Sequence, residues 1–290
     1  MGILLKGMPT AEMLTEKARE QALALKKKGV TPTLAIIRIG EREDDLAYER
    51  GAIKRCAQAH VAVESFALAQ QTTQATLITL IQKLNADKAI HGVLIMRPLP
   101  AHIEDSAVCR ALIPEKDIDG ITPGAMSGIY AGSQQVFAPC TAQACIEILK
   151  HNNISIAKKR AVVVGRSLII GKPVAMLLMA ENATVTVCHS KTESLPAVCR
   201  EADILVVAAG KPKMLGADAV SKGQVVLDVG IHVDENGQLC GDVDTQAASA
   251  VVAAVTPVPG GIGAVTTSVL ASHVVLAAQR IIKEELQNAN

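Results

Sequence analysis

Hydrophobic positions in this chain follow two patterns, short apolar runs and longer stretches with helical periodicity. The short runs are rich in Val, Ile and Leu, and this composition predicts strands of a parallel sheet that is buried on both faces. The longer stretches begin at capping residues such as Thr or Asp, which predicts helices. Strands and helices alternate along the chain, which indicates an α/β fold with a mostly parallel sheet.

In the first half, the pattern predicts three strands and three helices that alternate. The expected strands are 33–39, about 61–68 and 92–95, and the expected helices run from Thr10 to about 28, from Asp44 or Asp45 to about 59, and from Thr72 or Thr73 to about 85. The polar stretch 114–120 is rich in turn formers. A helix from Pro139-Cys140-Thr141 to about 150 is expected to link two domains.

In the second half, the apolar runs predict strands at 161–164, 183–188, 204–207 and 225–229. Helices are expected at 171–180 and from Thr266 or Thr267 to about 286. Several of these strands end in glycine turns, at the end of the sheet where doubly wound folds bind ligands.

The segment 161–190 predicts a βαβ unit around which the rest is organised. Gly165-Arg166-Ser167 follow the first strand directly, and Gly171-Lys172-Pro173 open the helix. In such a unit, backbone N–H groups and the positive end of the helix dipole converge on a pyrophosphate. The glycine spacing differs from G-x-G-x-x-G, so a tight strand-to-helix connection without a ligand is the alternative.

The end of the second strand of this unit distinguishes between NADP and NAD. Folds that prefer NAD carry Asp or Glu there for the ribose hydroxyls. This chain has Cys188-His189-Ser190-Lys191 instead. Ser190, Lys191 and Arg166 could hold an added phosphate by charge-assisted hydrogen bonds, which favours NADP over NAD.

Composition narrows the class of partner. A net charge of +1 and an aromatic content of 1% argue against nucleic acid, so a small-molecule partner is expected. The apolar stretches are too short to span a bilayer and the N-terminus has no signal-peptide pattern, so a soluble, cytoplasmic protein without a membrane partner is expected. The seven cysteines form no C-x-x-C pair and the histidines no ligand spacing, so reduced core thiols and no metal site are expected.

Eight stretches together resemble one family, and they occur in the same order as in that family. They are PEKDIDG (114–120), PCT (139–141), VVVGRS with GKP (162–173), ATVTVCHSKT (183–192), ADILVVAAGKP (202–212), VVLDVGI (225–231), GDVD (241–244) and TPVPGGIG (256–263). The family is that of the bifunctional methylenetetrahydrofolate dehydrogenase/cyclohydrolases of one-carbon metabolism. The resemblance implies a folate-binding catalytic domain at 1–140, completed by a C-terminal helix at about 267–290 that packs back on it. It also implies a Rossmann-like NADP-binding domain at 141–266, and a homodimer.

The resemblance also implies roles for individual residues. The nucleotide would be bound by Gly165, Arg166, Ser167, Ser190, Ile231 and Thr266, and the folate by Tyr48, Met96, Asp119, Gly260 and Gly263, with Tyr48 and Asp119 as catalytic residues. Ordinary structural roles are the alternatives: a core aromatic for Tyr48, a turn former for Asp119, loop geometry for Gly263 and a solvated hydroxyl for Ser190.

Three departures from the family pattern affect the predicted chemistry. The family has a lysine four residues after the tyrosine, on the same helix face, and this chain has Ala52 there. The glutamine that supports that lysine is Met96 here, and Ala264 and Val265 replace a proline and a methionine. Lys54 is about 120° away from the direction of Tyr48 around a helix.

Hydride transfer to NADP requires mainly that the folate and the nucleotide are correctly positioned. The cyclohydrolase step must also move protons, a task suited to a lysine of lowered pKa. The sequence therefore predicts a NADP-dependent dehydrogenase with weak or lost cyclohydrolase. One alternative is a bifunctional enzyme with a relocated basic residue, Lys54 or Arg97. The others are a non-catalytic folate- or nucleotide-binding protein and a different NADP dehydrogenase.

Overall fold

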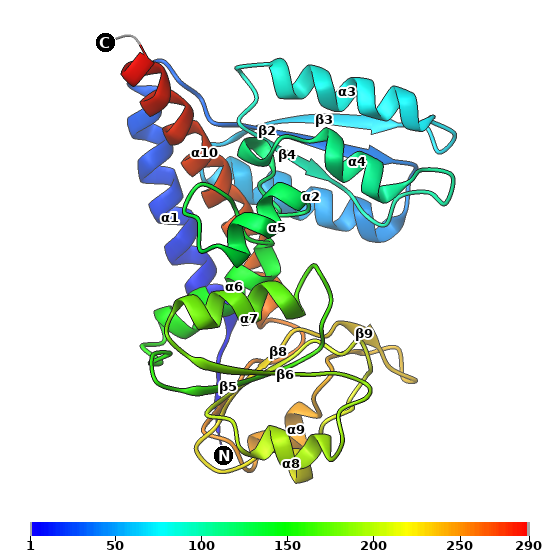
Figure 1. Ribbon diagram of the computed structural model, residues 1–290, viewed down its shortest axis with the longest axis vertical. Helices are drawn as coiled ribbons and strands as arrows, with labels where there is room; N and C mark the ends of the chain where they lie inside the picture. The colour runs from blue at the N-terminus through cyan, green and yellow to red at the C-terminus, as the bar shows by residue number, and fades with distance from the viewer. Residues whose placement is uncertain (1, 289–290) are drawn as a thin grey trace. The chain divides into compact units, whose positions relative to one another are not determined.

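A six-stranded parallel sheet organises one part of the chain in the computed structural model, which describes residues 2–288 (Figure 1). Its strand order is β1 (Ile3–Leu4), β11 (Ala254–Val255), β8 (Val225–Asp228), β7 (Ile204–Val207), β5 (Arg160–Val164) and β6 (Thr184–Cys188). Helix α7 (Gly171–Ala180) lies on one side of it, and α8 (Leu195–Arg200) and α9 (Thr245–Ser249) lie on the other. Because both faces are covered, β7 is buried along its whole length.

A second sheet has the order β3 (Ala62–Leu68), β2 (Thr33–Ile39) and β4 (Gly92–Ile95), again all parallel. Its core side packs against α3 (Gln74–Ala86) and α4 (Asp105–Ala111) through a cluster that includes Ile37, Ile81 and Val108. Helix α2 (Glu43–Gln58) lies on the opposite face (Figure 1). The C-terminal ends of β2 and β4 therefore point their side chains alternately toward α3 and toward α2.

The other described elements are helices, one hairpin and short turns. They are α1 (Gly7–Lys26), α5 (Pro123–Tyr130), α6 (Cys140–His151), α10 (Thr266–Asn288), the hairpin of β9 (His232–Val233) and β10 (Leu239–Cys240), and short 3₁₀ turns at 114–116, 217–219 and 262–264. Buried Lys116 donates from Nζ to the carbonyl oxygens of Leu84 at 2.7 Å and Asp87 at 2.5 Å. These bonds satisfy carbonyl groups at the C-terminal end of α3.

The chain divides into two units. Unit 1 comprises Met1–Ala11 and Thr141–Thr266, and unit 2 comprises Glu12–Cys140 and Thr267–Asn290. The first eleven residues thus group with unit 1, whereas the family resemblance implied that they belong to the first domain. The reason is pairing, because β1 extends the large sheet through β11, with Ile3 opposite Ala254.

The predicted α/β fold with a Rossmann-like domain is confirmed. Helix α1 begins at Gly7, three residues before the predicted cap at Thr10, because the Gly7 N–H donates to the Gly260 carbonyl at 2.8 Å. Thr10 is instead buried within the helix. The predicted cap at Thr73 is present, and its hydroxyl accepts from the Thr76 N–H at 3.2 Å. The prediction missed the short elements α4, α5, α8, α9, β1, β9, β10 and β11.

Candidate functional site

The strand order of unit 1 indicates where a ligand would bind. Strand β5 has β6 on one side and β7 on the other, so the connections that follow β5 and β6 leave in opposite directions. In open α/β sheets, ligands bind in the crevice at the carboxyl ends of strands where the order reverses. The loop after β5 begins with Gly165, and the loop after β7 begins with Ala208.

Gly165 allows these two loops to meet. Its φ of +126° is a conformation that favours glycine, and a Cβ there would lie 2.9 Å from the carbonyl carbon of Ala208. A Cβ on Gly171, the first residue of α7, would lie 2.5 Å from the carbonyl carbon of Gly165. The turn and the start of the helix are therefore packed backbone against backbone, as a pyrophosphate cradle requires.

Arg166 and Ser167 are exposed in this turn. The Ser167 hydroxyl oxygen accepts from the N–H groups of Ile170 at 3.1 Å and Gly171 at 3.3 Å, so it orders the entry into α7. The first turn of α7 contains no acidic residue. An anion at this helix N-terminus would thus meet the helix dipole and the Arg166 cation together.

The loop after β6 starts beside the Gly165 turn, since the Gly165 N–H donates to the Cys188 carbonyl at 2.9 Å. Ser190 and Lys191 are exposed, and the turn is closed by the Lys191 N–H, which donates to His189 Nδ1 at 3.1 Å. Residues 189–192 include no carboxylate. Arg166, Ser190 and Lys191 therefore form a cationic, hydrogen-bonding edge suited to a phosphate.

A cavity of about 280 Å³ lies at the C-terminal end of β8. It is lined by residues 228–231, Leu239 and the loop 257–264, and so contains three predicted site residues, Ile231, Gly260 and Gly263. A Cβ on Gly263 would lie 3.5 Å from the Ile231 side chain. Buried Thr266 donates from its hydroxyl to the Gly263 carbonyl at 3.1 Å, so it fixes this loop.

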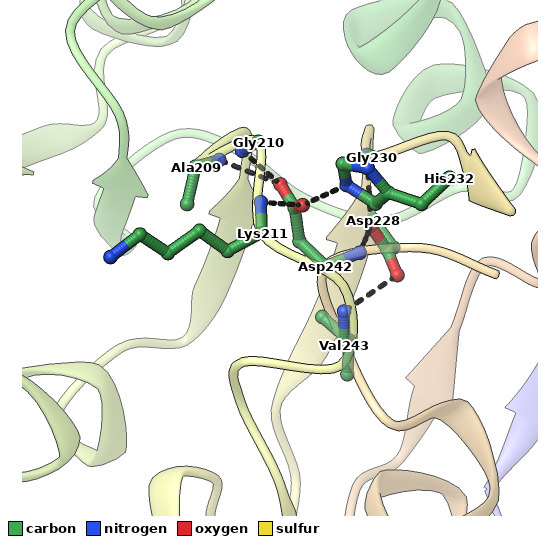
Figure 2. Close-up of polar contacts among 8 residues, drawn as sticks. All are labelled: Ala209, Gly210, Lys211, Asp228, Gly230, His232, Asp242 and Val243. Atoms are coloured by element: carbon green, nitrogen blue, oxygen red, sulfur yellow. Dashed lines mark hydrogen bonds and ion pairs between the residues drawn. The ribbon is translucent and has the colours of Figure 1, made fainter. Parts of the chain in front are cut away.

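Two buried carboxylates connect the loops at this end of the sheet (Figure 2). Asp242 accepts from the N–H groups of Ala209, Gly210 and Lys211 at 2.6, 3.0 and 2.8 Å, and from His232 Nε2 at 2.7 Å.

Asp228, at the end of β8, accepts from the N–H groups of Gly230, Asp242 and Val243 at 2.9–3.0 Å. Burial raises the pKa of Asp228 to about 6, and its three amide donors oppose that shift. In the sequence, GDVD was evident only as a family match, and no pattern predicted this network. An acidic pair flanking Val243 was the available signal.

In unit 2, Tyr48 and Ala52 lie on helix α2. Its buried residues are Asp45, Glu49, Ala52 and Cys56, and Ala52 is 0% exposed. Tyr48 is half-buried. Met96 directly follows β4, is buried, and donates its backbone N–H to the Ile37 carbonyl at 2.9 Å.

Asp119 lies beside the start of α6. Its Oδ1 accepts from the Cys140 N–H at 3.1 Å, and burial raises the pKa of its carboxyl while that bond opposes the rise. The neighbouring Ile118 carbonyl accepts from His273 Nδ1 at 2.8 Å. Asp119 is therefore a fixed carboxyl group on a well-supported backbone, and more than a simple turn former.

Of the two basic residues that could replace the missing lysine, one is in an ion pair and the other is exposed. Arg97 pairs with Asp105, and Lys54 is exposed on α2. The structure reveals another cation, Arg38 at the end of β2, whose Nε lies 2.8 Å from Glu49 Oε2. Both side chains are about 10% exposed. The signal in the sequence was a charged residue inside the apolar run 33–39.

The predicted site residues thus form three groups. The nucleotide turn brings together Gly165, Arg166, Ser167 and Ser190, and the cavity brings together Ile231, Gly260 and Gly263. Tyr48, Met96 and Asp119 belong to unit 2, whereas Gly260 and Gly263 belong to unit 1.

Two further observations concern the described residues. Within 2–288, no group of three His, Cys, Asp or Glu side chains is arranged to hold a metal ion, and no helix is both long and apolar enough to cross a membrane. All seven cysteines are buried and free of disulfides.

Comparison with known proteins agrees with this geometry. Residues 5–119 match the catalytic domain of the tetrahydrofolate dehydrogenase/cyclohydrolase family, and residues 139–282 match its NAD(P)-binding domain. The chain is 46% identical to the bifunctional protein FolD of Clostridioides difficile over 278 residues, 96% of this chain and 97% of that protein.

Two solved structures are also similar. The bifunctional enzyme FolD of Campylobacter jejuni is 36% identical with a TM-score of 0.94, covering 97% of this chain and 99% of that one. The Trypanosoma brucei FolD, solved with NADP cofactor and inhibitor, is 34% identical with a TM-score of 0.90, covering 97% and 98%. The chain belongs to the tetrahydrofolate dehydrogenase/cyclohydrolase family, and it is an enzyme of that family.

Proposed function

We propose that this protein is a NADP-dependent dehydrogenase that oxidises 5,10-methylenetetrahydrofolate to 5,10-methenyltetrahydrofolate, with cyclohydrolase activity weak or lost. The family provides the reaction class, and the departures at Ala52 and Met96 provide the distinction between the two activities. By the family resemblance, the folate residues would be Tyr48, Met96, Asp119, Gly260 and Gly263.

The residues at the end of the unit 1 sheet fit NADP. At Gly165 the turn packs directly against the Ala208 backbone, with no room for a Cβ, and the N-terminus of α7 provides the positive end of a dipole. Arg166, Ser190 and Lys191 provide donors for the extra phosphate that distinguishes NADP from NAD. When bound, NADP accepts the hydride, while these residues hold and orient it.

Dehydrogenation needs little proton chemistry from the protein. The lone pair on the folate nitrogen stabilises the cation as the hydride leaves, so positioning can provide much of the rate. Tyr48 and Asp119 would contribute that positioning. The Asp119 carboxyl is fixed by the Cys140 N–H, and so it offers a hydrogen-bonding group with a defined direction.

The single observation that carries the loss of cyclohydrolase is the burial of Ala52. It is 0% exposed on the same helix as Tyr48, where the family pattern has a lysine, and the position of the supporting glutamine is apolar Met96. Hydrolysis of the methenyl cation adds water and must then move protons. A guanidinium group is a poor general base, so neither Arg38 nor Arg97 replaces the lysine in that role.

A paired assay on one preparation tests the proposal. Reduction of NADP with methylenetetrahydrofolate is measured first, followed by the decay of added methenyltetrahydrofolate against buffer alone. NADP reduction with accumulation of the methenyl product is the expected result. Rapid decay well above the buffer rate would contradict the proposed loss, and binding of both ligands without turnover would contradict the dehydrogenase itself.

Replacing Arg166 with alanine is expected to raise the KM for NADP about tenfold and to leave the KM for NAD within about twofold. The physical reason is the loss of a charge-assisted hydrogen bond to the added phosphate, which only NADP carries. Steady-state kinetics with each nucleotide provide the measurement. Arg160→Ala, at the opposite end of β5, is the matched control and should change neither value. Equal increases for both nucleotides would exclude a role in selecting the phosphate.

We also propose a homodimer in the cytoplasm, on the basis of the family resemblance. Strand β6 is consistent with an assembly, because it lies at the edge of the six-stranded sheet and its Val187 side chain is 40% exposed.

A further inference from the structure

The network around Asp242 connects the loop that follows β7 to the segment that follows β8. The carboxylate accepts from three consecutive backbone N–H groups of the loop after β7, residues 209–211 (Figure 2). Its fourth donor is His232 Nε2 at 2.7 Å. Because the Asp242 side chain is 0% exposed, each of these bonds forms away from water.

His232 connects the Asp242 carboxylate to the segment that lines the cavity. It directly follows Ile231, which lines the cavity together with Gly260 and Gly263. A carboxylate can only accept, so His232 must carry its hydrogen on Nε2, whether the ring is neutral or protonated. Its side chain is 21% exposed, so it is the accessible end of a buried bond.

The other end of the network reaches the nucleotide turn. The loop that Asp242 holds begins beside Ala208, whose N–H donates to the Val164 carbonyl at 2.8 Å. The carbonyl carbon of Ala208 would lie 2.9 Å from a Cβ on Gly165. A continuous path thus runs from Gly165 through the loop 208–211 and Asp242 to His232. The path joins the turn to the cavity within unit 1.

We propose that His232 is a positioning residue for NADP, an inference that rests on the proposed function. It acts through Asp242, which already holds the loop 209–211, by tying the segment at Ile231 to that loop in the arrangement that the nucleotide needs. Without this bond, the segment at Ile231 would sample other arrangements, and binding would have to order it again. The loss would therefore appear in the affinity for NADP and in its KM, and kcat at saturating NADP would change little.

We expect the test variant, His232→Leu, to fold because most hydrogen bonds of the network remain. After His232→Leu, the carboxylate keeps its three backbone donors, and Asp228 keeps all of its own. His232→Gln places an amide N–H donor at a similar distance along the side chain and tests rescue. His102→Leu, which removes an exposed histidine in unit 2, is the matched control.

The experiment titrates each purified variant with NADPH, following the fluorescence of the nucleotide, and then measures KM for NADP, kcat and the melting temperature. His232→Leu is expected to raise the NADPH Kd and the KM for NADP about five- to tenfold, with kcat within about twofold. His232→Gln should return both values to within about threefold of the parent. His102→Leu should match the parent.

Three outcomes would overturn the inference. They are an unchanged Kd for His232→Leu, a Gln variant as weak as the Leu variant, and a fall in kcat without a change in Kd. The NADPH titration uses no folate, so it tests His232 independently of turnover. A parent protein that binds NADPH and fails to oxidise methylenetetrahydrofolate would contradict the proposed function alone.

Discussion

Introducing Ala52→Lys together with Met96→Gln is expected to raise the rate of methenyltetrahydrofolate hydrolysis by about 10²- to 10⁴-fold, the range typical of a general acid or base. The two changes restore the pair of residue types that the family pattern has at these positions. Dehydrogenase activity should stay within about threefold, because hydride transfer depends on positioning groups that the variant keeps. The decay of methenyltetrahydrofolate, corrected for the buffer rate, is the measurement.

The structure indicates how a lysine at position 52 would be tuned. Ala52 belongs to the buried stripe of α2, and burial disfavours the charged form of an amine, which lowers its pKa toward neutrality. Glu49 lies three residues earlier on the same stripe and already pairs with Arg38 at 2.8 Å. The carboxylate that would otherwise hold the new lysine fully protonated is therefore occupied.

The matched control places the same charge on the neighbouring residue. Ile53 is 40% exposed on α2, so Ile53→Lys with Met96→Gln adds a lysine directed to solvent and should leave the hydrolysis rate unchanged. Equal gains in both double variants would exclude a role for position 52. Circular dichroism is used to check that each variant is folded. A folded Ala52→Lys/Met96→Gln protein whose hydrolysis rate has not increased would contradict the explanation.

The elements that the sequence predicted well are those determined by local composition. The bounds of β2, β4, β7 and α7 agree with the prediction residue for residue, because each is a continuous apolar or periodic segment with a turn former beside it. Strands β1 and β11 have two residues each and exist by pairing with each other across about 250 residues. No local pattern predicts such a pairing.

The same distinction holds for the candidate site. Gly165 and Arg166 were found because a strand, a turn and a helix follow one another directly along the chain. His232 and Asp242 were missed because their partners come from three separate segments, 209–211, 228–232 and 241–243. Arg38 and Glu49 were missed for the same reason, since a strand and a helix bring them together.

Acidification is expected to lower the free energy of unfolding through His273. Burial lowers the pKa of His273 from 6.5 to about 4, and the Arg280 cation contributes to the shift. Between these two values the unfolded chain binds a proton that the folded chain does not, so stability falls as pH falls. The difference of about 2.5 pKa units corresponds to about 3 kcal/mol, fully present above pH 6.5 and lost on approach to pH 4.

His273→Asn tests this account, because it removes the titrating ring and keeps a donor for the Ile118 carbonyl. The variant should be less stable at pH 7, since the ring also packs against Phe137 with centroids 4.9 Å apart. Its unfolding free energy, measured by urea denaturation, should depend on pH more weakly than that of the parent between pH 6.5 and 4. His60→Asn is the control, because His60 is exposed and its φ of +55° suits asparagine. Parallel pH curves for the parent and His273→Asn would show that other groups cause the acid sensitivity. Curves that converge as the pH falls would assign it to His273, which supports the backbone beside Asp119.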